Sequence, residues 1–418
     1  MFIKTFKRLI AVISAIAFLS ASLLPGQSAA QDQSPIKIGG LAILSGPLSG
    51  YGKTGPMGAE LAVKEINAKG GILGRKVEYI VRDDEAKPDT GVRQARRLIL
   101  EDKVNFLIGV TSSAVLLAVM EIAKENKTIL VGTDAATARA TGEKCNKYFF
   151  RTSNNAAQDS RSAAFIMAEK PYKKWAVIAP DYEYGHSMWD NFIGTLKKLK
   201  PDVEVVAEAW PKLNAEDYSP YITQVLQAQP EAVFSALWSA GNINFVKQAK
   251  PHGFFDKIQL FAIGAGLMYE VVKTLGNEIP FDKYWGSSRY FPFAEDKLIP
   301  DTPKNREFIE AYKAAYGDYP EYLAEETYAG IYFIKAMVEK AGSLDVEALI
   351  KAGEGLSFEA PEGTKYIRPE DHQVVEDVVW GRLGPSKKYP FPALVEYVIV
   401  PGSKATPPVE ETGCKMQH

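Results

Sequence analysis

Two clusters near the start of the chain, one rich in glycine and one acidic, have spacings that could bind a nucleotide or form a paired-carboxylate site. The run Gly50 to Gly55 matches G-x-G-x-x-G, which binds dinucleotides when it directly follows a strand and opens a helix. Here residues 45–49 separate the preceding strand from the first glycine, and Asp83-Asp84 comes about thirty residues later. A P-loop fails as well, because Pro47 stands where its first glycine is required. Asp83-Asp84-Glu85 could be a paired-carboxylate site, but a solvated turn at the end of a strand is favoured.

Side chains suited to nucleophilic or metal chemistry are poorly placed for it. Ser112-Ser113 lacks the Gly-x-Ser-x-Gly context of a nucleophile elbow. The four histidines show no spacing that ties one of them to a serine, and with two distant cysteines they give no metal-ligand pattern. The sequence therefore predicts no catalytic residue, no metal site and no cofactor.

Ser113 has a different possible role. It stands just before a helix predicted to begin near Ala114, where free backbone N–H groups and the helix dipole favour an anion. This position predicts an anion-binding site in a chain that otherwise lacks reactive groups.

The elements that would position Ser113 alternate between apolar strand-like runs and amphipathic helix-like runs. Because a strand, a crossover helix and a parallel strand form the usual right-handed unit, this order predicts a parallel sheet with helices on both faces. The predicted strands are 36–44, 77–81, 104–108 and 128–131, and the predicted helices are 56–69, 90–100 and 114–125.

The same pattern begins again after residue 175, which predicts a second lobe of the same kind. Its strands are 175–179, 203–209, 232–237 and 259–263, with helices at 188–199, 218–227 and 244–250. A strand at 284–290, helices at 304–316, 324–340 and near Val346, and a β-rich end at 365–368, 373–381 and 394–400 complete the chain. The predicted fold class is thus α/β, with two doubly wound parallel-sheet lobes.

Residues 1–30 have the pattern of a signal peptide. Lys4, Lys7 and Arg8 precede an apolar run from Leu9 to Leu24, and 28–30 (Ser-Ala-Ala) offers small side chains for cleavage. The run is short for a transmembrane anchor, which is the alternative. No cysteine stands near the end of this run, where a lipoprotein would carry one, so we expect a soluble periplasmic product.

Length, charge and cysteine content narrow the class further. The 388 residues that remain after removal of residues 1–30 exceed what one hydrophobic core usually supports. Their net charge is −5, and they lack the basic stripe of a nucleic-acid binder. Cys145 and Cys414 are the two cysteines, and in an oxidising compartment such a pair favours a disulfide over two free thiols.

Several ordered motifs resemble the leucine/isoleucine/valine-binding proteins of the type I periplasmic binding fold. These motifs are S-G-P within 45–47, E-I-N-A-K-G-G-I-L-G-R at 65–75, F-L-I-G-V-T-S-S at 106–113, F-F-R-T-S at 149–153 and D-Y-E-Y-G at 181–185. The resemblance covers nearly all of the mature chain. It implies a three-segment hinge, with residues 31–151 and 284–366 in lobe I, 152–283 and 367–405 in lobe II, and 406–418 as a C-terminal tail.

The resemblance also implies which residues contact the ligand. Ser113, with Ser112 as the one-residue alternative, would hold a carboxylate, and Ala135 and Thr137 would add backbone and hydroxyl contacts. The aromatic contacts would be Tyr51 from lobe I and Tyr184 and Trp238 from lobe II.

One departure from the family bears on the ligand. Its amino-acid binders place a glutamate after the strand at 259–263 to pair with the ligand ammonium, whereas 264–266 here reads Gly-Ala-Gly. Because an unpaired ammonium in a closed cleft is costly, a carboxylate without an amine is favoured unless Glu325 or Glu326 supplies the charge.

The resulting hypothesis is a monomeric substrate-binding component of an ABC importer. It would bind a branched-chain or hydrophobic amino acid, or an aromatic acid, and dock on an inner-membrane permease. A ligand sensor of the same fold and a secreted enzyme on a doubly wound sheet are the alternatives.

Overall fold

The computed structural model describes residues 33–416, so the predicted signal peptide at 1–30 lies outside the described residues. Residues 1–34 and 35–418 are two separate units, and the fold below is that of the second unit. In residues 33–416 no helix combines the length and apolar character needed to cross a bilayer.

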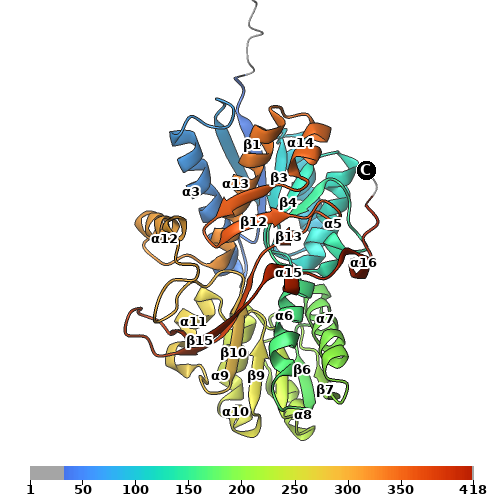
Figure 1. Cartoon of the computed structure of the whole chain (residues 1–418), viewed down its shortest axis with the longest axis vertical. Helices are drawn as coiled ribbons and strands as arrows, with labels where there is room; N and C mark the ends of the chain where they lie inside the picture. The colour runs from blue at the N-terminus through green and yellow to red at the C-terminus, as the bar shows by residue number, and fades with distance from the viewer. Residues whose placement is uncertain (1–32, 417–418) are drawn as a thin grey trace, which may run out of the picture. The chain divides into compact units, whose positions relative to one another are not determined.

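Lobe I is built on a five-stranded parallel sheet with the order β2-β1-β3-β4-β5 (Figure 1). Its strands are β1 (Ile36–Ala42), β2 (Val77–Asp83), β3 (Phe106–Gly109), β4 (Ile129–Gly132) and β5 (Phe149–Arg151). Its first helices are α2 (Ser49–Gly52), α3 (Thr54–Ala68), α4 (Pro88–Leu100) and α5 (Ser113–Glu125), followed by the short η1 (Ala138–Thr141).

Both faces of this sheet are buried. In β3, Phe106 and Ile108 join the core under α3, while Leu107 between them joins the core under α4 and α5. Alternate residues of a strand point to opposite faces, so the short apolar run FLIG is buried throughout, as is usual in parallel sheets. The predicted doubly wound lobe is therefore present.

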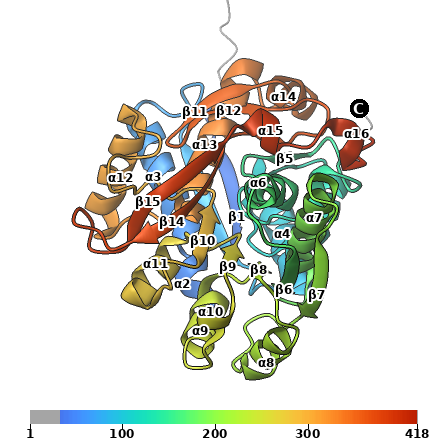
Figure 2. The ribbon, with the colours of Figure 1, turned by 60° about the horizontal axis from the view of Figure 1, so that its bottom comes forward.

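Lobe II is built on a seven-stranded sheet with the order β15-β14-β10-β9-β8-β6-β7, in which the last two strands of the chain form one edge (Figure 2). Its strands are β6 (Lys174–Ile178), β7 (Glu204–Ala209), β8 (Ala232–Ser235), β9 (Leu260–Ile263), β10 (Tyr284–Ser288), β14 (Val378–Gly384) and β15 (Ala393–Val400). Its helices are α6 (Ala156–Ala168), α7 (Glu183–Leu199), α8 (Ser219–Gln227), α9 (Ser239–Ala249), α10 (Phe254–Lys257), α11 (Tyr269–Leu275), η2 (Gly276–Glu278) and α15 (Gly402–Ala405).

The C-terminal part of lobe I consists of helices and a small antiparallel sheet. The helices are α12 (Pro303–Tyr316), α13 (Tyr322–Ala341) and α14 (Val346–Gly353), and the sheet has β11 (Ser357–Ala360), β12 (Gly363–Ile367) and β13 (Val374–Val375). Helix α13 packs closely on α3: a Cβ added at Gly58 would lie 1.9 Å from the Ala324 carbonyl oxygen, so only glycine permits this approach.

Three segments carry the chain between the lobes: residues 152–155 after β5, residues 289–302 after β10, and residues 376–377 between β13 and β14. The strand β10 corrects a predicted boundary. We placed residues 284–366 in lobe I, but β10 pairs with β9 and with β14 in the second sheet, so the crossing comes after Ser288.

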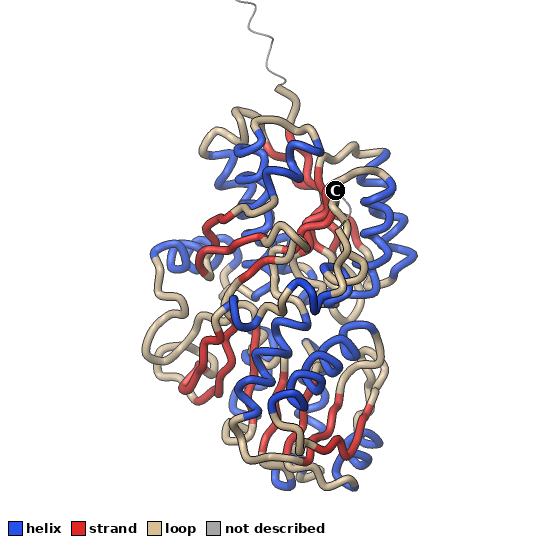
Figure 3. The backbone as a smooth tube through the Cα atoms, turned by 45° about the vertical axis from the view of Figure 1, so that its right-hand side comes forward, coloured by secondary structure: helices blue, strands red, loops and turns tan. Residues whose placement is uncertain are grey.

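Helix α6 was not predicted (Figure 3). Its polar residues Gln158, Asp159, Ser160 and Ser162 are buried. The helix begins at a capping box between Asn155 and Gln158. Gln158 and Ser160 donate hydrogen bonds to distant segments of the chain. The helix is therefore buried although it lacks the apolar stripe from which burial is usually predicted.

The C-terminal tail is attached to lobe I. Cys145 and Cys414 form a disulfide, with their Cα atoms 5.6 Å apart. The short helix α16 (Val409–Thr412) lies between this bond and α15, next to η1. The predicted pairing of the two cysteines is present in the structure.

Candidate functional site

A cavity enclosing about 320 Å³ lies at the carboxyl ends of strands from both lobes. Apart from Tyr322, its lining residues follow strands β1, β3, β4, β6, β8, β9 and β10. Ligands bind at this edge in open α/β sheets because the loops there are free to carry polar groups. The lining residues are Tyr51, Thr111, Ser113, Asp134, Ala136, Tyr182, Tyr184, Trp238, Ala265, Arg289 and Tyr322.

Ser113 is placed in the cavity by the start of α5. Ser112 is the N-cap residue, and among residues 33–416 its side chain makes no capping hydrogen bond. The first amides of a helix lack acceptors within the helix and carry the positive end of its dipole. The Thr137 amide donates a 3.1 Å hydrogen bond to Ser113 Oγ, which fixes the orientation of the serine. The arrangement is suited to a carboxylate.

Five aromatic rings surround this helix start. The Tyr51 ring of lobe I lies with its centroid 5.9 Å from that of Trp238 in lobe II and 5.4 Å from that of Tyr322. Trp238 Nε1 donates to the Tyr182 hydroxyl at 3.1 Å, which ties two of the lobe II rings together. These rings offer an apolar enclosure whose two sides come from different lobes.

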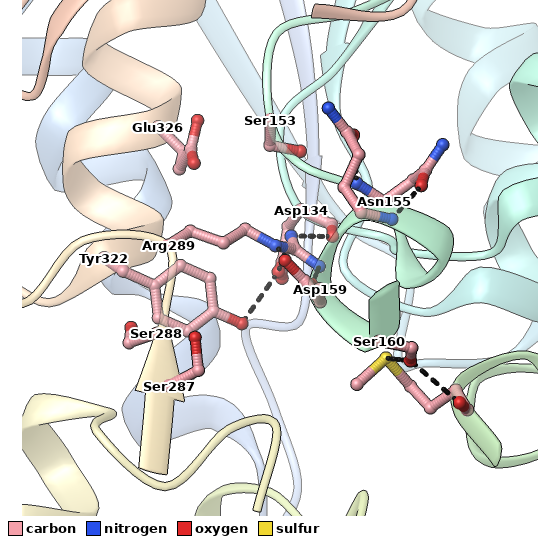
Figure 4. Close-up of polar contacts among 12 residues, drawn as sticks. Asp134, Ser153, Asn155, Asp159, Ser160, Ser287, Ser288, Arg289, Tyr322 and Glu326 are labelled. Carbon is pink, nitrogen blue, oxygen red and sulfur yellow. Dashed lines mark hydrogen bonds and ion pairs between the residues drawn. The ribbon is translucent and has the colours of Figure 1, made fainter. Parts of the chain in front are cut away.

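Arg289 is the cation of the cavity, and the sequence analysis missed it. Its guanidinium points toward two buried carboxylates, Asp134 and Asp159, with the Tyr322 ring beside it (Figure 4). It donates to the Asp134 carbonyl and lies 3.5 Å from one carboxylate oxygen of each aspartate. Burial alone would lower the pKa of Arg289, but Asp159, Tyr322 and Asp134 raise it well above its usual value, so the guanidinium is charged.

Asp134 is the acid on the cavity wall. The Tyr322 hydroxyl donates to its Oδ1 at 3.0 Å, whereas Oδ2 has no hydrogen-bond partner among the described residues. Burial raises the pKa of Asp134, and Arg289 and the Tyr322 hydroxyl partly offset that rise. Burial likewise raises the pKa of Asp159 to about 6. The hydroxyls of Tyr51 and Thr111 also lower the pKa of Asp134, so a donor group on a ligand would compete with them for Asp134 Oδ2.

Four of the predicted ligand contacts line the cavity, and four do not. Tyr51, Ser113, Tyr184 and Trp238 are brought together there. Ser112, Ala135, Thr137 and Glu325 lie outside the lining.

The loop after β4 is displaced by one residue from the predicted register. The Ala135 amide donates to the Val110 carbonyl at 3.0 Å, and the Thr137 hydroxyl donates to Glu183 at 2.5 Å. Both groups are therefore occupied within the protein. Asp134 and Ala136, the alternate residues of the loop, face the cavity instead.

Glu325 and Glu326 do not supply the acid that the family's glutamate would provide. Both are buried on α13 beside Lys365, and neither lines the cavity. The acid that lines the cavity is Asp134, which follows β4 and not the strand that carries the family's glutamate.

Three residues of the cavity wall that the sequence did not predict lie close to features that it did. Arg289 follows a strand that we predicted to continue to Tyr290, so its position at a strand end was hidden. Tyr182 lies in the motif at 181–185, two residues from Tyr184. Asp134 lies two residues after the buried strand β4 and next to the predicted contact Ala135, and an acid so close to a strand end was the signal that could have identified it.

The chain matches known proteins over most of its length. Residues 35–388 match the family model described as periplasmic binding protein. A Leu/Ile/Val-binding protein homolog 7 of Brucella suis is 28% identical and covers 82% of this chain and 86% of its own. A homolog 4 of Brucella abortus is 26% identical over 97% of both chains.

Solved structures agree with the fold. A solute-binding protein of an ABC transporter from Rhodopseudomonas palustris, solved with 3,4-dihydroxybenzoic acid, has a TM-score of 0.78 at 25% identity, covering 89% of this chain and 98% of its own. An ABC transporter substrate-binding protein from Sphaerobacter thermophilus has a TM-score of 0.77 at 26% identity, covering 88% and 98%. The chain therefore belongs to the periplasmic binding protein family, the substrate-binding components of ABC transporters.

Proposed function

We propose that this protein binds a small carboxylate with an aromatic or branched apolar body and delivers it to an inner-membrane ABC permease. The observation that carries the proposal is the cavity in which the start of α5, five aromatic rings and the Asp134–Arg289 pair face one another. The protein acts in the periplasm as a monomer after removal of residues 1–30, and it releases the ligand unchanged.

Binding couples to closure because both lobes contribute to the walls. Tyr51 and Ser113 come from lobe I, and Tyr184 and Trp238 come from lobe II. A ligand that contacts all four residues binds the closed form better than the open form and shifts the population toward it. The closed form is the one that docks on the permease.

Asp134 narrows the class of ligand further. The carboxylate of the ligand lies at the amides of α5, its body lies between the rings, and a hydrogen-bond donor lies against Asp134 Oδ2. An ammonium or a ring hydroxyl supplies that donor. The names of the relatives cover both chemistries, since one group is named for leucine, isoleucine and valine and another was solved with a dihydroxybenzoic acid.

A thermal-shift screen of the mature protein with matched ligand pairs tests the proposal. The pairs are leucine with 4-methylpentanoate, phenylalanine with 3-phenylpropanoate, and 4-hydroxybenzoate with benzoate. Ligand binding to the folded state raises the melting temperature. We expect one of the three pairs of carboxylates to raise the melting temperature. Within that pair, the member with the ammonium or ring hydroxyl should produce the larger rise in wild type. In Asp134→Asn the two members should produce similar rises.

Two adjacent serines provide a matched control. Ser113→Ala removes a hydroxyl from the cavity wall, whereas Ser112→Ala removes a buried hydroxyl outside it. We expect Ser113→Ala to weaken carboxylate binding and Ser112→Ala to leave it near wild type. Equal affinity in all three proteins would contradict the assignment of the helix start, and recovery of a chemically altered ligand would contradict binding without turnover.

A further inference from the structure

A second buried polar group, which we call the hinge acid cluster, lies where the chain crosses between the lobes. It consists of Glu325 and Glu326 on α13, Glu362 in the turn between β11 and β12, Lys365 on β12, and Glu376 in the crossing between β13 and β14. Lys365 Nζ also donates to the carbonyl of Thr152 in the first crossing, at 2.8 Å. The cluster thus joins lobe I to two of the three hinge segments.

Lys365 cannot satisfy all four carboxylates. Its ammonium has three protons, and its Nζ lies 2.8 Å from the Thr152 carbonyl, 2.8 Å from Glu326 Oε2 and 2.8 Å from Glu376 Oε2. Glu362 also contacts it. Among the described residues the hydrogen bonds of the ammonium go to Thr152 and Glu326, so Glu362 and Glu376 contact it as ion pairs without a hydrogen bond, and four carboxylates share one cation.

Several carboxylate oxygens of the cluster are left over. Glu325 is 0% exposed, no side chain among the described residues donates a hydrogen bond to either of its oxygens, and the backbone amide of Glu362 lowers its pKa in part. Glu326 Oε1, Glu362 Oε1 and both oxygens of Glu376 also have no hydrogen-bond partner among the described residues. Burial raises the pKa of Glu325 to about 7 and raises that of Glu326 further. A buried carboxylate without a partner is costly, so the cluster lacks positive charge.

The spacing of three of the acids matches the coordination shell of a hard cation. One oxygen each from Glu325, Glu326 and Glu362 lies within 4.8 Å of the others. Oxygens that coordinate calcium at about 2.3–2.6 Å can lie at most about 5 Å apart across the ion. Three carboxylates also provide the ligand type that calcium and magnesium prefer over nitrogen or sulfur.

A groove next to the hinge reaches Glu362, one of the three acids. The groove encloses about 1100 Å³ and is lined by Glu362, Lys365 and Glu376 together with Arg289. Because Glu362 is partly exposed there, an ion held by the three acids can complete its shell with water.

We propose that Glu325, Glu326 and Glu362 bind a divalent cation of the calcium or magnesium class at the hinge. This is a site distinct from the ligand cavity, and the sequence analysis missed it because it searched for metals among histidine and cysteine. The bound ion replaces the missing positive charge and ties α13 to the turn before β12. By strengthening lobe I beside the crossing at Glu376, it stabilises the hinge.

Calcium binding to the chelator-treated full mature protein tests the proposal, measured by equilibrium dialysis against CaCl₂ and repeated with MgCl₂. We expect saturable binding of one ion per chain, and at least about tenfold weaker binding in Glu325→Gln. Glu410→Gln removes an exposed carboxylate at the tail and is the charge-matched control, so it should bind as wild type does. A rise of the melting temperature with CaCl₂, but not with NaCl of equal ionic strength, should accompany binding.

Two results would overturn the proposal. One is the absence of saturable binding of either ion at millimolar concentration, which would mean that protons alone satisfy the acids. The other is equal affinity in wild type and Glu325→Gln. If Glu325→Gln does not fold, Glu362→Gln replaces it, because Glu362 lies in a partly exposed turn. Wild-type affinity in that variant would overturn the proposal equally.

Discussion

The ligand cavity and the hinge acid cluster are two buried polar sites that differ in their ratio of acids to cations. In the cavity, Asp134 and Asp159 face the guanidinium of Arg289, whose five donors can serve both carboxylates. In the hinge, Glu326, Glu362 and Glu376 contact the single ammonium of Lys365, and Glu325 is a fourth acid of the cluster. Both sites hold more acids than cations, and the excess is larger at the hinge.

This difference bears on what each site can accept. The cavity has rings, a helix start and a paired acid already in place, so an incoming carboxylate displaces water without breaking the ion pairs. Within residues 33–416 the hinge has carboxylate oxygens without a hydrogen-bond partner, which is why we propose that it takes up a cation. Arg289 lines both the cavity and the hinge groove, and its charge acts on both sites.

Replacing Arg289 should produce the largest effect, because it leaves two buried carboxylates without their cation. We expect Arg289→Gln to reduce the free energy of unfolding by about 3–5 kcal/mol at pH 7, measured by urea denaturation. Arg382→Gln is the control, since it removes an exposed pair with Glu396 and should cost less than about 1 kcal/mol. A similar loss in both variants would contradict the importance of the buried pairs.

Replacing Lys365 should have a smaller and pH-dependent effect. The folded-state pKa values of Glu325 and Glu326 are raised by burial, so the folded protein binds more protons than the unfolded chain and is less stable as pH rises. We expect Lys365→Met to cost about 2–3 kcal/mol at pH 8 and less at pH 5, where protons replace the ammonium.

The exposed Lys273, which pairs with Asp318, provides the control for this variant. Lys273→Met should change the free energy of unfolding by less than about 1 kcal/mol at either pH. A loss in Lys365→Met that is larger at pH 5 than at pH 8 would contradict the excess of negative charge.

In the cavity, truncating a ring should affect binding more than folding. We expect Tyr184→Ala to weaken ligand binding about tenfold to a hundredfold, by removing one aromatic wall of lobe II. Isothermal titration with the best ligand from the matched pairs measures this loss. Tyr366→Ala, at an exposed tyrosine of β12, should retain wild-type affinity. An equal loss of affinity in this variant would contradict the role of Tyr184 as a ligand contact.

Asp84 offers the smallest and simplest test, because it is a buried acid with no ion pair among residues 33–416. Burial raises its pKa to about 6, so the folded state holds an extra proton between about pH 4 and 6 and loses stability as pH rises through that window. We expect Asp84→Asn to stabilise the protein by about 1 kcal/mol at pH 8 and to have little effect at pH 4.5.

The neighbouring Asp83 is the matched control with the opposite sign. Burial is the largest single influence on its pKa and raises it, but the hydrogen bonds from Ser45 and from the Leu44 and Glu85 amides together outweigh burial and lower the pKa. Asp83→Asn should therefore destabilise the protein at pH 8. Thermal unfolding of Asp83→Asn and Asp84→Asn at pH 4.5 and at pH 8 measures the difference. Identical pH profiles of the two variants would contradict the opposite pKa shifts of the two acids.

The sequence alone determined the parts of this molecule that depend on local spacing. The apolar strands and the helix that starts at Ser113 could be predicted, because periodicity and helix starts involve residues within a few positions of one another. These features were enough for the α/β class and for Ser113, whereas Tyr51, Tyr184 and Trp238 were predicted from the resemblance to a known family.

Only the tertiary structure decided how charges were distributed. Arg289 meets Asp134 across 155 positions of sequence, and Lys365 meets Thr152 across 213, so no local pattern announces either contact. Such pairs form because burial penalises each isolated charge, and the partner is whichever opposite charge the fold brings near. That is why Glu325, which we predicted as a possible ligand contact, belongs to the hinge, and why Asp134 lines the cavity instead.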